Sequence, residues 1–248
     1  MTHISYQLYC SRNFPPLSET LKMLSAAGFK EVEGYGALFD DVDAVKAAFE
    51  GTDLKMTSSH IGLDLMEGDP AKAIEIIRDF GMRAAFVPYL QEDERPTDTA
   101  GWTAFGERLA KISEPFVAAG IKFGWHNHDF ELVATETGEM PLDLMMAAAP
   151  DMMLELDLGW VTRAGEDPVA WINKYAGRIA AVHIKDVAPA GENTDEDGWA
   201  DVGHGTMDWA AIHAALQAAG VDHYVVEHDN PSDHQRMATR SLTTASNF

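Results

Sequence analysis

The chain has few basic residues for its size and almost no cysteine. Its 248 residues hold 18 Lys and Arg against 40 Asp and Glu, a formal net charge of −22. Proteins that bind nucleic acid usually carry a cluster of Lys and Arg, and the sequence shows none, so we expect no nucleic-acid partner. Cys10 is the single cysteine and cannot form an intramolecular disulfide, which predicts a reducing, cytoplasmic setting.

Long apolar runs are missing as well. No segment approaches the ~20 residues that cross a membrane, and the first residues, MTHISYQLYC, lack the pattern of a signal peptide. We therefore expect a soluble protein without a membrane partner. No glycine-rich phosphate loop follows the first apolar run, QLYCSRNFPP, which argues against a dinucleotide-binding fold. With 46% hydrophobic and 23% charged residues, the composition is that of a globular protein with a substantial core.

Short apolar runs alternate with amphipathic segments along the whole chain. The expected strands are Ile4–Tyr9, Phe29–Gly34, Leu54–His60, Ala84–Tyr89, Ile121–His126, Met152–Asp157, Ile179–Ile184 and His223–His228. The expected helices are Ser18–Ala27, Asp41–Phe49, Pro70–Phe80, Thr99–Ala119, Leu142–Ala148, Pro168–Tyr175, Trp209–Ala219 and Ser232–Ala245. Such alternation indicates parallel strands, and eight units suit a closed barrel. We predict an α/β fold, a single (β/α)8 TIM-barrel domain over 1–248, with an open doubly wound sheet as the alternative.

Metal-ligating side chains end four of the apolar runs, where turn residues are usual. The runs IKFGWHNH, MMLELD, IAAVH and HYVVE end on His128, Asp157, His183 and Glu227. In a parallel barrel the carboxyl ends of the strands meet at one rim, which holds the active site. A charge that closes an apolar strand costs free energy unless it is paired or bound to metal. We therefore predict a metal site that includes Asp157, His183 and Glu227.

A fourth ligand is expected from the segment WHNHDFEL. His126 and His128 point to the same side of an extended strand, because side chains alternate, and Glu131 follows three residues later. We expect one of the three to bind the ion and the others to contact substrate; charge favours Glu131. Carboxylate and imidazole ligands together suit Mn²⁺, Mg²⁺, Co²⁺ or Zn²⁺, and we predict one such ion per chain.

Other side chains near the same rim are candidates for contact with substrate. Glu33, His60 and Lys185 are expected to orient hydroxyl groups or to stabilise a developing oxyanion. Trp125 and Trp160 flank the predicted site and could form an apolar wall against a sugar ring. Each of these has a structural alternative, namely a solvated charge, a histidine bonded to the backbone or a packed indole. Asp186, His228 and Asp229 are further candidates at the rim. Glu155 shares a face with Asp157 and is expected to point into the barrel below the metal.

The motifs WHNHDFEL, LELDLGW, VHIKD and VVEHD resemble those of the sugar phosphate isomerase/epimerase family of xylose-isomerase-like barrels. The resemblance extends from ISYQLY to the last helix. Members of that family include ketose 3-epimerases, inosose dehydratases and isomerases, hydroxypyruvate isomerases, dehydroshikimate dehydratases and enzymes acting on 3-keto-glycosides. The family's metal set is Glu, Asp, His and Glu, and Asp157, His183 and Glu227 match the last three. His126 stands where the family has its first Glu, and Glu131 is the nearest carboxylate.

The resemblance implies a divalent-metal-dependent isomerase or epimerase acting on a keto-sugar or a sugar derivative. Its chemistry would be removal of the proton next to a carbonyl, through an enediolate that the ion stabilises. Glu227 is the first candidate for the base, and His126, His128 and Lys185 are the other catalytic candidates. The alternatives are a dehydratase acting on an inosose or a 3-keto-glycoside, a non-catalytic sugar-binding barrel and, against the acidity of the chain, a metal-dependent apurinic endonuclease.

The resemblance also implies the partner, a small sugar or cyclitol. The sequence leaves the oligomeric state open, a homo-oligomer included.

Overall fold

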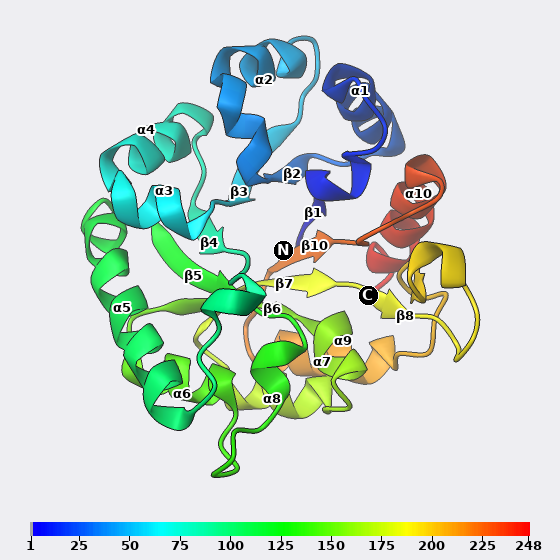
Figure 1. Ribbon diagram of the computed structural model, residues 1–248. Coiled ribbons are helices and arrows are strands. Elements are labelled where there is room, and N and C mark those ends of the chain that lie inside the picture. The colour runs from blue at the N-terminus through cyan, green and yellow to red at the C-terminus, as the bar shows by residue number, and fades with distance from the viewer. Residues whose placement is uncertain (1) are drawn as a thin grey trace.

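The structure, a computed structural model, describes residues 2–248 as a closed barrel of parallel strands surrounded by helices (Figure 1). Eight strands of the described residues form the barrel: β1 His3–Gln7, β2 Glu31–Gly34, β3 Lys55–His60, β4 Ala84–Val87, β5 Lys122–His126, β6 Met153–Asp157, β7 Ile179–Ile184 and β10 His223–Val226. Neighbours in the chain are neighbours in the barrel, and β1 closes it by pairing with both β2 and β10. The predicted TIM barrel is confirmed, and the open sheet is excluded.

Helices connect the strands and cover the outside of the barrel (Figure 1). Their bounds are α1 Leu17–Ala27, α2 Val42–Phe49, α3 Leu63–Gly68, α4 Pro70–Phe80, α5 Thr99–Ala118, α6 Pro141–Ala148, α7 Leu158–Arg163, α8 Pro168–Lys174, α9 Trp209–Ala218 and α10 His234–Ala245. Short 3-10 helices cover Leu8–Ser11, Gly36–Asp41, Glu92–Glu94, Phe130–Leu132 and Thr194–Glu196. Only α3 and α7 lack a predicted counterpart, since both are too short to show a clear period. Within residues 2–248 no helix is long and apolar enough to span a membrane.

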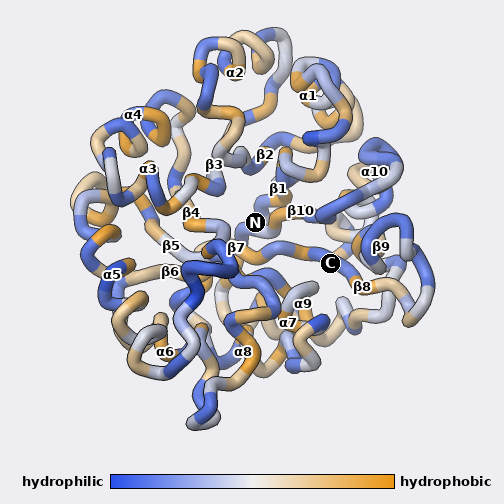
Figure 2. The backbone as a smooth tube through the Cα atoms, in the orientation of Figure 1, coloured by the Kyte–Doolittle hydropathy of each residue, from blue (hydrophilic) through white to orange (hydrophobic). Residues whose placement is uncertain are grey.

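Local sequence signals set the ends of the helices. Asp69 accepts a hydrogen bond from the backbone N–H of Lys72, and Pro70 takes the first helical position, so that α4 begins there. At the other end of α4, Gly81 adopts φ +68°, a left-handed conformation that costs glycine little. Along the helices, hydrophobic and hydrophilic residues alternate, while the loops carry long hydrophilic stretches (Figure 2). Each helix therefore has an apolar face to pack on the barrel.

The interior of the barrel is apolar only in part. A small apolar cluster separate from the main core contains Ala84, Phe86, Ala180, Ala181 and Val225. The main core lies between the strands and the helices. Successive side chains of a strand point alternately outward and into the barrel. Some of the inward-pointing side chains are polar, and Glu33 and Glu155 are buried examples. Buried charge inside a barrel is costly unless it is paired, so this part of the interior is a candidate for function.

A small hairpin leaves the barrel between β7 and α9. It consists of β8 Asp186–Val187 and β9 Trp199–Ala200, which pair antiparallel. The carboxylate of Asp186 is fully buried at the base of the hairpin. It accepts hydrogen bonds from the backbone N–H groups of Val187, Gly203, Gly205 and Met207 and from the indole N–H of Trp209. The side chain of Asp186, directly after Lys185, thus connects the two ends of the segment between β7 and α9.

Candidate active site

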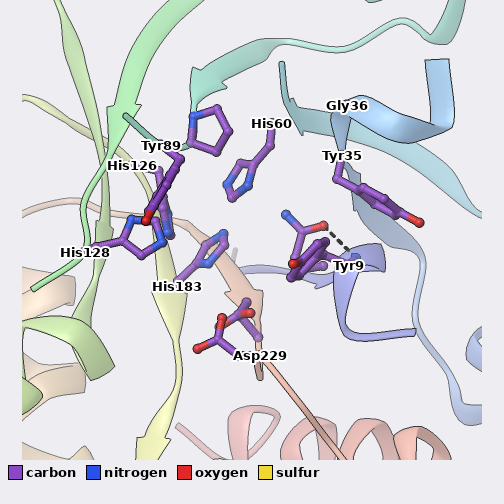
Figure 3. Close-up of a pocket in the computed structure, with 12 residues that line it drawn as sticks. Tyr9, Tyr35, Gly36, His60, Tyr89, His126, His128, His183 and Asp229 are labelled. Carbon is purple, nitrogen blue, oxygen red and sulfur yellow. Dashed lines mark hydrogen bonds between the residues drawn. The ribbon is translucent and has the colours of Figure 1, made fainter. Parts of the chain in front are cut away.

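A cavity of about 370 Å³ opens among the carboxyl ends of the strands (Figure 3). It is lined by Gln7, Tyr9, Tyr35, Gly36, His60, Pro88, Tyr89, His126, His128, His183, Glu227 and Asp229. These residues come from segments throughout the chain, because every parallel strand delivers its last residues to the same rim. Six of the candidate residues therefore meet at one cavity: His60, His126, His128, His183, Glu227 and Asp229.

Asp157, His183 and Glu227 form the first of two groups that could hold a metal ion. One ligand atom from each lies within 4.8 Å of the others, and all three side chains are buried. Asp157 Oδ2, His183 Nδ1 and Glu227 Oε2 have no hydrogen-bond partner. Buried polar atoms without partners are rare in folded proteins because they are costly. Three that converge, two from carboxylates and one from an imidazole, fit a divalent cation.

The imidazole of His183 is oriented from behind by two glutamates. Its Nε2 lies 2.7 Å from Glu33 Oε1 and 3.2 Å from Glu155 Oε2. A carboxylate accepts hydrogen bonds, so the hydrogen belongs on Nε2, and Nδ1 is left to face Asp157 and Glu227. Burial lowers the pKa of His183, but the charges and hydrogen bonds of Glu155 and Glu33 outweigh burial and raise that pKa above its usual range. A carboxylate behind a ligating imidazole is the usual second partner of a metal-bound histidine.

The second group surrounds Glu155 inside the barrel and contains His60, His126 and again His183. Figure 3 shows these three imidazoles turned toward one another, and their ring centroids are 4.5–5.3 Å apart. Glu155 Oε2 lies 2.6 Å from His60 Nε2 and 3.2 Å from His126 Nδ1. Burial raises the pKa of Glu155, but His183 and His60 outweigh burial and lower it well below its usual range. Glu155 is therefore a shared, ionised acceptor, and it points into the barrel as expected.

Lys185 is a fully buried cation beside the first group. Its Nζ is hydrogen-bonded to Asp229 and lies 2.8 Å from Glu227 Oε2, without hydrogen-bond geometry. The indole ring of Trp199 covers the ammonium at 4.0 Å from its centroid. Burial lowers the pKa of Lys185, but the charges of Asp229 and Glu227 outweigh burial and raise it. Lys185 is thus a fixed positive charge at the site, and the alternative of a solvated surface residue does not apply.

The structure does not bring Glu131 to either group of candidate metal ligands. Its two oxygens accept hydrogen bonds from the indole N–H of Trp125 and from the backbone N–H of His128, both at 2.8 Å. Burial raises the pKa of Glu131 to about 7. The predicted role as a ligand therefore lacks support, because both carboxylate oxygens already have donors. The sequence favoured Glu131 because it is an acid close to two histidines. This closeness does not show which hydrogen-bond donors its carboxylate contacts in the fold.

Trp125 lies on the outer side of the barrel wall. Its ring packs edge-on against Phe105 of α5, with centroids 5.5 Å apart, and none of its surface is exposed. Strand alternation explains the difference, because the side chain before the inward-facing His126 must point outward. Trp125 is not one of the residues that line the cavity, so the expected wall against a sugar ring is not formed by it.

Trp160 stands beside the cavity without lining it. Its ring lies 5.3 Å from His128 and 4.8 Å from Trp199, centroid to centroid. The backbone N–H of Trp160 donates to Asp157 Oδ1 at 2.8 Å, so that α7 begins on a residue of the metal group. This contact leaves Asp157 Oδ2 as the free atom of that carboxylate.

Several residues at the cavity have no counterpart among the predicted contacts. Tyr9 lies in the 3-10 helix after β1 and Tyr89 in the loop after β4, and Gln7 ends β1 with its amide donating to Glu33 Oε1 at 2.8 Å. The expected strands extended to both tyrosines, but β1 ends at Gln7 and β4 at Val87. Strand periodicity therefore could not give the direction of either tyrosine side chain.

A closed (β/α)8 barrel with buried carboxylates and imidazoles at the carboxyl ends of its strands defines the class: a TIM barrel with a site able to bind a metal ion. Residues 21–244 match the model of the family described as xylose isomerase-like TIM barrel, and the chain belongs to that family. The resemblance found in the four motifs is thereby confirmed. The family includes sugar isomerases and epimerases as well as dehydratases, which act on small sugars and cyclitols.

Known proteins similar to this chain carry several activities. An inosose dehydratase from Lacticaseibacillus casei is 26% identical over 182 residues, which cover 65% of this chain and 58% of that protein. The match thus spans less than two thirds of that relative. A sugar phosphate isomerase/epimerase from Parabacteroides distasonis ATCC 8503 has 22% identity and a TM-score of 0.79, over 98% of this chain and 92% of that one.

One similar structure is described as the IOLI protein with a binding zinc atom. It has 17% identity and a TM-score of 0.71, over 100% of this chain and 96% of that one. At such identities the two structural matches support the fold.

Proposed function

We propose that the protein is a divalent-metal-dependent isomerase or epimerase that removes the proton next to the carbonyl of a keto-sugar or sugar derivative. The observation that carries the proposal is the convergence of Asp157 Oδ2, His183 Nδ1 and Glu227 Oε2, buried and without hydrogen bonds, beside the cavity. A divalent ion, Mn²⁺, Mg²⁺, Co²⁺ or Zn²⁺, supplies Lewis-acid polarisation of a carbonyl when it is bound at such a site.

Asp157, His183 and Glu227 would hold this ion, and Glu131 takes no part in our assignment. Three protein ligands are typical of catalytic metal sites, which keep a position for water or substrate. Glu33 and Glu155 keep His183 in the tautomer that presents Nδ1 to the ion. The alternative ion position around Glu155 is less favourable. Among the described atoms there, only Glu155 Oε1 and His126 Nδ1 lack partners, whereas the facing nitrogens of His60 and His183 are bonded to Glu155 and Glu33.

The other residues supply charge and proton transfer in this proposal. Glu227 lines the cavity, so the oxygen of its carboxylate that does not bind the ion is placed to accept the α proton. Lys185, held protonated by its carboxylate neighbours, stabilises negative charge that develops on a substrate oxygen. Burial lowers the pKa of both His126 and His128, so their imidazoles are neutral near pH 7. They line the cavity and are candidates to return a proton or to orient a hydroxyl group.

A dehydratase is the second candidate. The similarity to an inosose dehydratase favours it, as does His126 at the end of β5, where the resemblance leads one to expect a carboxylate. Both reactions begin with removal of the same proton. They differ afterwards, because the dehydratase expels a β-hydroxyl group instead of returning the proton to the substrate.

The test is exchange of the α proton with solvent. The purified protein, loaded with Mn²⁺, Co²⁺ or Zn²⁺ in turn, is incubated in D₂O with a panel of ketoses and cyclitol ketones and followed by ¹H NMR. We expect metal-dependent loss of one α-proton signal, with an isomer or epimer as product; a product lighter by one water would identify the dehydratase. Exchange that is equally fast after removal of the ion contradicts the proposed mechanism. An ion-loaded protein that exchanges no proton in any compound supports a non-catalytic barrel.

A further inference from the structure

Two exposed tyrosines stand at the mouth of the cavity. Tyr9 is 39% exposed and Tyr89 is 41% exposed, and both line the cavity. Tyr9 packs edge-on against Tyr35 with centroids 5.4 Å apart, and Tyr89 packs edge-on against His128 at 5.0 Å. Figure 3 shows Tyr89 on one side of His60 and Tyr9 and Tyr35 on the other. Large apolar side chains that stay exposed at a cavity usually mark the contact surface of a ligand.

Arginines support these tyrosines from outside the cavity. The guanidinium of Arg12 lies 3.9 Å from the ring centroid of Tyr9 and donates to the backbone carbonyls of Tyr9 and Asp229. Arg95 donates to the carbonyl of Leu90 and to the hydroxyl of Tyr89. Neither arginine is a lining residue of the cavity. Their charges therefore hold the tyrosines in place and are not presented to a ligand inside.

The cavity itself is strongly acidic. Glu227 and Asp229 are among its lining residues. The carboxylates of Glu33, Glu155 and Asp157 are buried behind the lining, next to His183, His60 and Glu227. The one ammonium among them, that of Lys185, is fully buried and shared between acids. A divalent ion and this ammonium would offset part of the negative charge of these carboxylates. Among the described residues, the cavity lining includes no Lys or Arg, the side chains that usually bind a phosphate group.

We propose that the cavity binds an uncharged polyhydroxy ketone and discriminates against phosphorylated sugars, with Tyr9 and Tyr89 as the residues that contact the C–H face of the sugar. A phosphate group brings a charge of about −1.5 to −2 at pH 7, and here it would meet like charge and no cationic donor. The net charge of −22 acts in the same direction during the approach to the site. This inference takes the location of the site from the proposed function, but it concerns binding and does not require turnover.

The experiment compares neutral ketoses with their phosphates on the same ion-loaded protein. The probes are D-fructose with D-fructose 6-phosphate, D-tagatose with D-tagatose 6-phosphate, and an inosose as a neutral cyclitol. Binding is measured by saturation-transfer NMR titration, and α-proton exchange is measured in parallel. We expect the neutral member of each pair to bind at least tenfold more tightly. In 1 M NaCl, where the Debye length is about 3 Å, the discrimination should narrow, because part of it is charge repulsion.

Variants test the part played by the tyrosines. Tyr9→Ala and Tyr89→Ala should each weaken binding of the neutral probes about fivefold or more. The matched control is Val133→Ala, which removes an exposed hydrophobic side chain that does not line the cavity. It should bind as the unaltered protein does. Tyrosine variants that bind equally well would overturn the assignment of these two residues.

The outcomes separate this inference from the proposed function. A preference for neutral probes without any proton exchange would refute the enzymatic proposal and leave the inference standing. Exchange or binding that is as good with the phosphates would overturn the inference and leave the enzymatic proposal standing. If none of the neutral probes binds, the inference is overturned as well, because the cavity would then not take an uncharged ketone.

Discussion

His183 and Glu33 meet across the barrel, with Nε2 of the imidazole 2.7 Å from Oε1 of the carboxylate, although 150 positions separate them in the sequence. Glu33 comes from β2 and His183 from β7, so that only closure of the barrel brings them together. The contact decides which ring nitrogen of His183 is left for an ion. It makes the orientation of a candidate ligand depend on a residue that is not itself a ligand.

Glu33→Gln should weaken binding of the ion without abolishing it. Gln7 and His183 both donate to Oε1, and Ser58 donates to Oε2, so one amide oxygen can serve only one of these two positions. In either orientation the negative charge behind His183 is lost, so His183 would be held less firmly. Changes behind a ligating histidine typically reduce metal affinity about 10–100-fold, and we expect a loss in that range, measured by calorimetric titration with Mn²⁺. Glu31→Gln, at the opposite end of the same strand, is the control and should titrate normally.

Asp157→Asn and His183→Ala should lose most of the bound ion. We expect about one divalent ion per chain in the unaltered protein, since catalytic sites of this ligand type hold a single ion, and a small fraction of that in the variants. Asparagine can still cap α7 through its side-chain oxygen, as Asp157 does with the N–H of Trp160, so the fold should survive. Elemental analysis decides the matter; full ion content in both variants would refute the ligand assignment.

Glu131→Gln should lower stability and leave the ion in place. Both oxygens of Glu131 accept from N–H groups, and glutamine would turn an NH₂ group toward one of them. A buried donor without an acceptor costs about 1–3 kcal/mol, so the free energy of unfolding in urea should fall by that amount. Loss of the ion at unchanged stability would instead restore Glu131 as a ligand.

Glu227→Gln should abolish α-proton exchange while disturbing the fold little. The amide keeps nearly the same shape and one oxygen, but it cannot accept the proton. General-base catalysis typically contributes ~10²–10⁴-fold, and we expect the exchange rate to fall by at least that factor. Exchange at nearly the original rate, in a variant shown to hold its ion, would move the role of base to His126 or His128.

Acid should destabilise the protein through His223, which lies far from the cavity at the start of β10. Its side chain is buried, its Nε2 has no partner, and burial lowers its pKa to about 4. In the unfolded chain the pKa is about 6.5, so between these values the unfolded state binds more protons. Stability is therefore present above about pH 6.5 and is lost as the pH falls toward 4, by up to about 3 kcal/mol from this group.

The measurement is urea unfolding at a series of pH values. His223→Gln, which cannot be protonated, should flatten the decline between pH 6.5 and 4. Other buried histidines will keep part of that decline in the variant, since burial also lowers the pKa of His128 and His228. An unchanged slope would mean that His223 is not buried as a neutral imidazole.

The barrel and the strand-end acids were predictable from the sequence because both follow from the period of strands. Alternation shows that Asp157 and Glu155 share a face, and parallel strands bring Asp157, His183 and Glu227 to one rim. The same alternation in β5 predicts that Trp125, one residue before the inward-facing His126, points outward. Glu131 could not be placed in this way, because it lies in a 3-10 turn whose direction depends on tertiary contacts with Trp125.

The hairpin after Lys185 is fastened at its base and again near its tip, where the buried carboxylate of Glu196 accepts hydrogen bonds from Ser232 and Arg236. Asp186 gathers five N–H groups at the base, and at Gly205 even a single added carbon would collide with its carboxylate. Residues 189–195 of the tip, by contrast, are exposed. Insertions or exchanges there should therefore leave the position of Lys185 unchanged. The sequence of this exposed segment can therefore vary between related proteins, while Lys185 and the candidate metal ligands keep their positions.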